Sequence, residues 1–114
     1  AAVRLHGVDA VIATNTSLAR TGVEGLPHAG EAGGLSGAPI RQRANHALSV
    51  LAGTLGDSIA LIGAGGIACA DDAADRIRTG AHLVQLYTGL VYRGPRLIAE
   101  CVRAIAAARL EALA

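Results

Sequence analysis

The 114-residue sequence contains no phenylalanine and no tryptophan, and aromatic residues make up only 2% of it. Hydrophobic residues nevertheless account for 52%, so a core has to be built from alanine, valine, leucine and isoleucine. This mixture is typical of folds in which parallel strands alternate with covering helices, because such strands are buried on both faces. The length is sufficient for one domain with a modest core.

Strong charge and long apolar runs are also absent. The net charge of +1 argues against a nucleic-acid partner. The apolar runs fall far short of the roughly 20 residues that span a bilayer, and no signal peptide or basic leader opens the chain.

The two cysteines, Cys69 and Cys101, and the four histidines lack the spacing of a metal or redox site. We therefore expect no metal centre and a pair of reduced intracellular thiols.

Three short apolar runs are followed by polar or glycine-rich residues, which is the pattern of buried parallel strands that lead into loops. They predict strands at residues 9–14, 58–63 and 83–87. Apolar residues at helical spacing predict helices at residues 39–51, 70–77 and 95–108. Residues 1–6 have the pattern of a helix end that Gly7 closes.

The alternation of strand and helix predicts a parallel sheet with right-handed crossovers. Such a sheet could be the edge of a doubly wound sheet or an arc of a (β/α)8 TIM barrel. The barrel is favoured because all three strands end in loops with site-like residues, and barrel enzymes place their sites at these ends. A complete barrel needs about 250 residues. Residues 1–114 are therefore interpreted as an arc, about three βα units, of an α/β barrel domain.

The segment Gly-Ala-Gly-Gly-Ile at 63–67 lies between a predicted strand and a predicted helix. Glycines there let backbone N–H groups approach an anion, and the following helix dipole favours negative charge. The segment is not the dinucleotide fingerprint, and a plain tight turn is the alternative. Phosphate is favoured because Tyr-Thr-Gly at 87–89 ends the next strand, and barrels frequently bind phosphate after strands 7 and 8. A Cβ at Gly66 is expected to push the phosphate away from its donors or to force a disfavoured backbone conformation.

Two further segments have less specific patterns. Thr-Asn-Thr at 14–16 offers an amide and two hydroxyls at a strand end, and an amide suits the edge of a planar heterocycle. An ordinary polar turn is the alternative. Gly-Gly-Leu-Ser-Gly at 33–37 lies in the long loop that follows. Long loops in compact domains tend to be functional or disordered, so both interpretations stay open. The helix arginines, Arg41, Arg43, Arg76 and Arg78, are expected on solvated faces.

These four segments, in this order, resemble the C-terminal region of the dihydroorotate dehydrogenases. The matching stretches are residues 12–16, 33–37, 62–67 and 80–89. The Tyr-Thr-Gly ending looks like the class 2, quinone-reducing branch of the family. Two departures from the family pattern, Ala64 and Cys69, are small and supply none of the contacts in question.

The resemblance implies an FMN-containing barrel that oxidises dihydroorotate to orotate in pyrimidine biosynthesis and passes the electrons to a quinone. It also implies that residues 1–114 are the C-terminal arc of that single barrel domain, whose N-terminal portion lies outside this chain. By position, it implies that Thr14 contacts the flavin, and that backbone groups hold the FMN phosphate and ribityl chain at Gly37, Gly66, Tyr87 and Thr88. It implies that Asn15 and Thr16 contact the pyrimidine substrate. Such a site uses the phosphate for binding and leaves the reactive ring open to substrate.

The family's serine base and a flavin-contacting lysine lie on earlier barrel loops, and neither has a counterpart in this sequence. The spacing of Ser17 does not support the role of base, so no catalytic residue is assigned and the chain alone is expected to be inactive. The family's membrane-associating N-terminal segment has no counterpart either. Peripheral association with the cytoplasmic side of the cell membrane is therefore expected only for the full-length protein.

Two alternatives stay open. The first is another FMN barrel, of the nucleotide-dehydrogenase or 2-hydroxyacid-oxidase kind, although Asn15 beside Thr14 and the loop at 33–37 argue against it. The second is a non-catalytic barrel fragment whose exposed strands pair with another chain, because open barrel edges present unpaired backbone groups.

Overall fold

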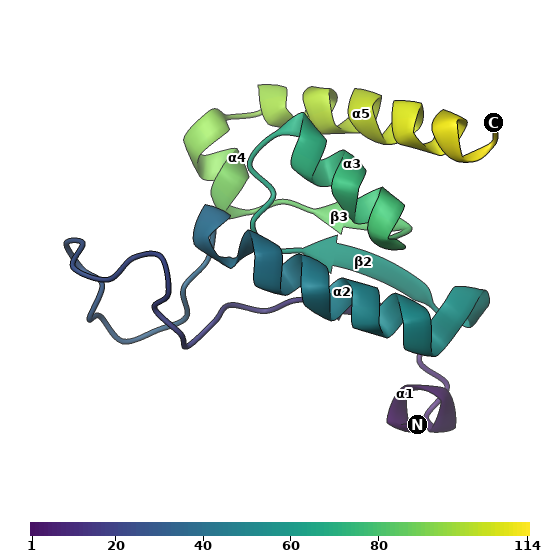
Figure 1. Ribbon diagram of the computed structural model, residues 1–114, viewed down its shortest axis with the longest axis horizontal. Coiled ribbons are helices and arrows are strands. Elements are labelled where there is room, and N and C mark those ends of the chain that lie inside the picture. Colours follow the sequence, from purple (N-terminus) through teal and green to yellow (C-terminus); the bar gives the residue numbers. More distant parts are fainter.

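All residues, 1–114, are described by the computed structural model, in which three strands and their helices form one layered unit (Figure 1). The strands are β1 (Ala10–Ala13), β2 (Ala60–Ala64) and β3 (Leu83–Gln85). The α-helices are α1 (Ala2–Leu5), α2 (Arg41–Leu55), α3 (Ala70–Thr79), α4 (Thr88–Arg93) and α5 (Arg96–Ala112). Two short 3-10 helices, η1 (Ala38–Ile40) and η2 (Gly56–Ser58), flank α2. No helix combines the length and the apolarity that crossing a membrane requires.

The sheet is parallel throughout, with the spatial order β1-β2-β3. The predicted parallel strands and their order are thus confirmed. The strand ends differ from the prediction by one or two residues, because Ser58 belongs to η2 and Tyr87 lies beyond the end of β3. Because the strands are parallel, their C-terminal ends all lie at the same edge of the sheet.

The sequence does not predict α4, which begins at Thr88 in a segment expected to be a loop. Six residues are too few for a helical periodicity to stand out. The helix ends at Gly94, whose φ of 74° glycine adopts readily. Residues 88 and 89, which the sequence predicts to be a loop, therefore belong to the first turn of a short helix. The backbone N–H groups of a first turn have no acceptor within the helix.

The helices cover one face of the sheet. In Figure 1, α2 lies in front of β1 and β2, α3 lies beside α2, and α5 packs against α3. Leu61 points into this helical layer, while the register-matched row of Ile12, Ile62 and Leu83 points to the opposite face. Ile12 and Leu83 remain 56% and 57% exposed. A one-sided helical cover fits the arc of a barrel, whose second face lines the interior, rather than a doubly wound sheet.

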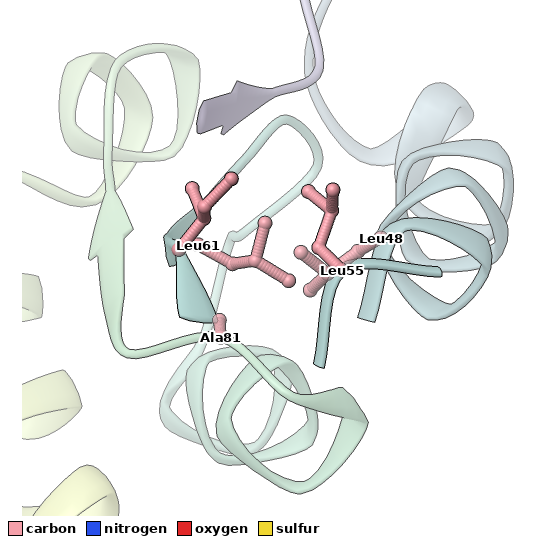
Figure 2. Close-up of a cluster of buried hydrophobic side chains, with 5 residues drawn as sticks. Leu48, Leu55, Leu61 and Ala81 are labelled. Atoms are coloured by element: carbon pink, nitrogen blue, oxygen red, sulfur yellow. The ribbon is translucent and has the colours of Figure 1, made fainter. Parts of the chain in front are cut away.

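Two aliphatic clusters hold the helices on the sheet. The first joins α2, β2 and the turn before β3, as Figure 2 shows, and consists of Leu48, Leu55, Ile59, Leu61 and Ala81. The second joins α3 and α5 beside the end of β3 and consists of Ile67, Ala73, Leu97 and Cys101. Burial raises the pKa of the Cys101 thiol, so this residue packs as a neutral apolar group. Both clusters lack aromatic rings, as the composition requires.

Leu48→Ala should lower the free energy of unfolding by about 2–5 kcal/mol, because Leu48 is fully buried and its truncation leaves a cavity. Val50→Ala, on the exposed side of α2, is the control and should change it by less than about 0.5 kcal/mol. Urea denaturation followed by circular dichroism measures both. Equal effects of the two substitutions would show that Leu48 does not belong to the core.

Candidate functional site

The C-terminal ends of the three strands open onto one cavity of about 310 Å³. Its walls come from the end of β1, the end of the long loop, η1, the loop after β2 and the start of α4. The cavity is lined by all seven residues that the sequence assigns to cofactor or substrate: Thr14, Asn15, Thr16, Gly37, Gly66, Tyr87 and Thr88. The structure brings these residues together, and what each of them binds remains a prediction.

A single arginine holds the long loop between β1 and η1. The guanidinium of Arg20 donates hydrogen bonds to five carbonyl oxygens of this loop, those of Ser17, Leu18, Ala29, Glu31 and Gly33. A backbone bridge between Ser17 and Leu35 closes the same loop. The loop is therefore organised rather than plainly flexible. Sequence reasoning missed Arg20, because hydrogen bonds to carbonyl groups up to 13 residues away leave no local pattern.

The end of the long loop meets the start of α4. Ser36 Oγ and Thr88 Oγ1 form a hydrogen bond of 2.7 Å. A Cβ on Gly37 would lie 3.0 Å from Thr88 Cγ2, and Gly37 has a φ of 82°. Glycine satisfies both the close contact and the left-handed backbone conformation without strain. The contact between Gly37 and Thr88 closes one wall of the cavity.

Backbone N–H groups beside the cavity have no partner inside the protein. Those of Gly65, Gly66, Ile67 and Tyr87 donate to no carbonyl oxygen and to no side chain. The N–H of Thr88 belongs to the first turn of α4, where such groups lack an intrahelical acceptor. Free N–H donors gathered around one cavity suit an anion such as phosphate.

The structural reason for glycine at position 66 differs in part from the expected one. A Cβ on Gly66 would lie 2.4 Å from Arg41 Cα and 2.7 Å from Arg41 N, so it would collide with the backbone at the start of α2. A Cβ at this position would therefore point at α2. The expectation that a Cβ would meet the phosphate is wrong, because the Cβ would meet α2. The φ of 74° confirms the other expected reason, a backbone conformation that a Cβ disfavours.

Arg76 is buried, whereas the sequence predicted a solvated position for it. Its side chain is 1% exposed, and its Nη2 donates to the carbonyl oxygens of Gly65 at 2.5 Å and Arg41 at 3.1 Å. Burial lowers the pKa of Arg76, although a guanidinium stays protonated at neutral pH. In the sequence Arg76 borders the apolar stripe of α3, but no local pattern marks it as buried.

Asp72 links α3 to α2 next to residues 65–67, the glycine-rich loop that follows β2. Its Oδ2 accepts a hydrogen bond from Ala68 N–H at 3.0 Å, and its Oδ1 pairs with Arg41 Nη1 at 2.9 Å. Burial alone would raise the pKa of Asp72, but the Ala68 N–H and the Arg41 guanidinium together outweigh burial and lower the pKa. Arg41 is thus paired and half-exposed rather than merely solvated.

Asp72→Asn should lower the free energy of unfolding by about 1–3 kcal/mol at neutral pH, because the amide keeps the shape but loses the charge. The folded state lowers the pKa of Asp72, so its stabilisation is present above about pH 4 and is lost as pH falls through the folded pKa. The destabilisation by Asp72→Asn should therefore shrink as the solution is acidified. Urea unfolding of both proteins at neutral and acidic pH measures it, and a difference independent of pH would contradict this role.

The sequence profile of the family described as dihydroorotate dehydrogenase matches residues 1–108. The dihydroorotate dehydrogenase (quinone) of Azotobacter vinelandii is 62% identical over 105 residues, which make up 92% of this chain and 30% of that protein. The protein of the same name from Pseudomonas paraeruginosa is 60% identical over 101 residues, 89% of this chain and 30% of that protein. This chain therefore spans 30% of the length of these curated relatives.

Solved structures give the same result for the fold. A crystal structure of ligand-free DHODH from Eimeria tenella matches with a TM-score of 0.83 and 33% identity over 90% of this chain and 29% of that chain. A second structure from Eimeria tenella, in complex with ferulenol, matches with a TM-score of 0.84 and 33% identity over 90% of this chain and 27% of that chain. The predicted α/β barrel arc is thereby confirmed, and this chain belongs to the dihydroorotate dehydrogenase family.

Proposed function

We propose that this chain is the C-terminal part of a quinone-dependent dihydroorotate dehydrogenase and forms the phosphate end of its FMN site. The observation that carries the proposal is the cavity at the strand ends, which gathers seven expected site residues and free N–H donors. The names of the bacterial relatives support the choice of reaction. The remainder of the barrel, including the base, is proposed to come from residues outside this chain.

The donor set fits the phosphate of FMN. A phosphate monoester carries nearly two negative charges at neutral pH and offers three strong acceptor oxygens. Gly66, Tyr87 and Thr88 would donate backbone N–H groups to it, and Gly37 would close the far side of the cavity. Hydrogen bonds to a charged acceptor are roughly twice as strong as neutral ones. The volume of about 310 Å³ lies at the small end for ligand sites, as expected where only one end of a ligand is enclosed.

The residues after β1 are proposed to orient the reacting partners. Bound FMN would supply the hydride acceptor for the oxidation of dihydroorotate to orotate and the route of the electrons to a quinone. Thr14 would contact the flavin, with Asn15 and Thr16 at the edge of the pyrimidine. Asn15 Oδ1 accepts the N–H of Thr16 at 2.7 Å, which leaves the Asn15 amide hydrogens free to donate to a substrate oxygen. Placing these three residues in succession would hold the substrate beside the flavin.

The full-length protein is proposed to lie peripherally on the cytoplasmic side of the cell membrane, where a quinone dissolved in lipid can reach it. Attachment would be the task of an N-terminal segment outside this chain. The quinone-type relatives support this placement.

In the full-length protein that carries this chain, Gly66→Ala should lower FMN affinity by about 10²–10⁴-fold, which corresponds to the loss of two charge-assisted hydrogen bonds. The added Cβ would meet the Arg41 backbone and push the loop, with its donors, out of place. Thr88→Ser should retain FMN, because the hydroxyl and the backbone donor both survive. Flavin absorbance retained after purification is the measurement.

Gly53→Ala is the matched control for this prediction. Gly53 is an exposed glycine of α2, and a Cβ there would have no neighbour within 4 Å, so FMN should be retained. Thermal unfolding of each apoprotein separates a loss of FMN from a loss of the fold. Full flavin occupancy in Gly66→Ala would argue decisively against the proposed phosphate site.

The 114-residue chain alone should form no orotate from dihydroorotate above background, even with FMN added. It lacks the base that takes a proton as hydride leaves the substrate, and a positioned acid or base contributes roughly 10²–10⁴-fold. The full-length protein should be active with a quinone acceptor and should restore growth without pyrimidine to bacteria that lack this enzyme. Orotate absorbance is the measurement, and turnover by the isolated chain would show that the active site lies elsewhere.

A further inference from the structure

Burying the charged side chain of Arg76 costs free energy. Its side chain is 1% exposed, yet no carboxylate lies within ion-pair distance of its guanidinium, and Nη1 has no partner of any kind. The nearby carboxylate of Asp72 is occupied by Arg41 and by the N–H of Ala68. Burying a charge without a paired opposite charge is costly. The two carbonyl acceptors of Arg76 and the neighbouring carboxylates of Asp72 and Asp75 offset part of this cost.

Arg76 contacts three separate parts of the site from behind. Its Cβ, Cγ and Cδ pack against Gly63, where a glycine Cβ would lie 3.3 Å from each of them. Its Nη2 donates to the carbonyl oxygen of Gly65 at 2.5 Å and to that of Arg41 at 3.1 Å. Arg76 thus joins the end of β2, the glycine-rich loop and the start of α2. Arg76 itself does not line the cavity, so it acts on the cavity only through the loop.

The bond to Gly65 fixes the direction of the next N–H group. The peptide bond between Gly65 and Gly66 is trans, so the Gly65 carbonyl and the Gly66 N–H point in opposite directions. A carbonyl held toward Arg76 therefore turns the Gly66 N–H away from Arg76, and Gly66 lines the cavity whereas Arg76 does not. A peptide unit between two glycines rotates easily, because neither residue has a Cβ that restricts it. Arg76 supplies the restraint that the glycines lack.

We propose that Arg76 is a positioning residue that holds this peptide unit in the orientation that presents the Gly66 N–H to a phosphate. The inference rests on the proposed FMN site and adds to it a residue that touches neither cofactor nor substrate. Arg76 also places a positive charge without a direct ion-pair partner behind the anion site, which favours the phosphate over the uncharged part of the flavin. Loss of Arg76 therefore weakens the binding of the phosphate end in particular.

The test compares FMN with riboflavin, which has the same ring and chain but no phosphate, in apoprotein of the full-length protein that carries this chain. Quenching of flavin fluorescence gives both dissociation constants. Arg76→Met should lower the preference for FMN over riboflavin by about 10–100-fold and leave riboflavin affinity unchanged. Arg76→Lys, which keeps a cation at the end of a long stem, should restore most of the preference. Arg78→Met, at an exposed arginine of the same helix, is the control and should change neither constant.

The outcomes separate this inference from the proposed function. Equal weakening of FMN and riboflavin binding by Arg76→Met would mean a general structural role and would overturn the inference. Unchanged FMN preference would overturn it as well. Arg76→Gln gives the same comparison with a polar side chain if Arg76→Met does not fold. An unmodified protein that binds FMN no better than riboflavin would instead refute the proposed phosphate site.

Discussion

Parallel hydrogen bonding among the three strands is the constraint on which the site depends. Because β1, β2 and β3 run in the same direction, their C-terminal ends meet at one edge, with Ala13 opposite Gly63 and Ala64 opposite Gln85. The N–H of Thr14 donates to the carbonyl oxygen of Ala64 at 2.8 Å and extends this pairing past the end of β1. Segments that lie far apart in the chain thereby become the walls of one cavity. An antiparallel partner at any position would have sent its loop to the opposite edge.

The face of the sheet opposite the helices carries apolar side chains that this chain leaves uncovered. Ile12, Ile62 and Leu83 form a register-matched apolar row on that face, and no helix of the chain covers it. In a barrel such residues stack in layers with residues from the other strands. The chain spans 30% of its bacterial relatives, so the material to complete those layers exists in proteins of this family. A stable fragment that pairs with another chain would need to cover the same row and the same strand edges.

The sequence predicted those features that rest on local pattern. Strand and helix alternation and the parallel order follow from periodicity, glycine-rich loops and the rules of barrel topology. The choice of the seven candidate residues came instead from the resemblance to the family, and the fold brings them to one cavity. It failed where the cause is a long-range contact between side chain and backbone. Arg20 and Arg76 resemble ordinary polar positions in the sequence, and only the fold shows that both donate to distant carbonyl oxygens. The sequence did not predict the short helix α4 for a different reason, because six residues are too few to show a helical periodicity.

The conformation of the glycine-rich loop is constrained by contacts within the protein, although its glycine pattern suggests a ligand site. The position of Gly66 is fixed by contact with the Arg41 backbone, and that of Gly65 by a hydrogen bond from Arg76. Neither constraint requires a bound anion. The N–H groups are consequently free and oriented before a ligand arrives, so binding does not have to order the loop, and the hydrogen bonds that form contribute more fully to affinity. The contribution that we propose for this chain to an FMN site is thus preorganisation of the loop by its contacts with α2 and α3.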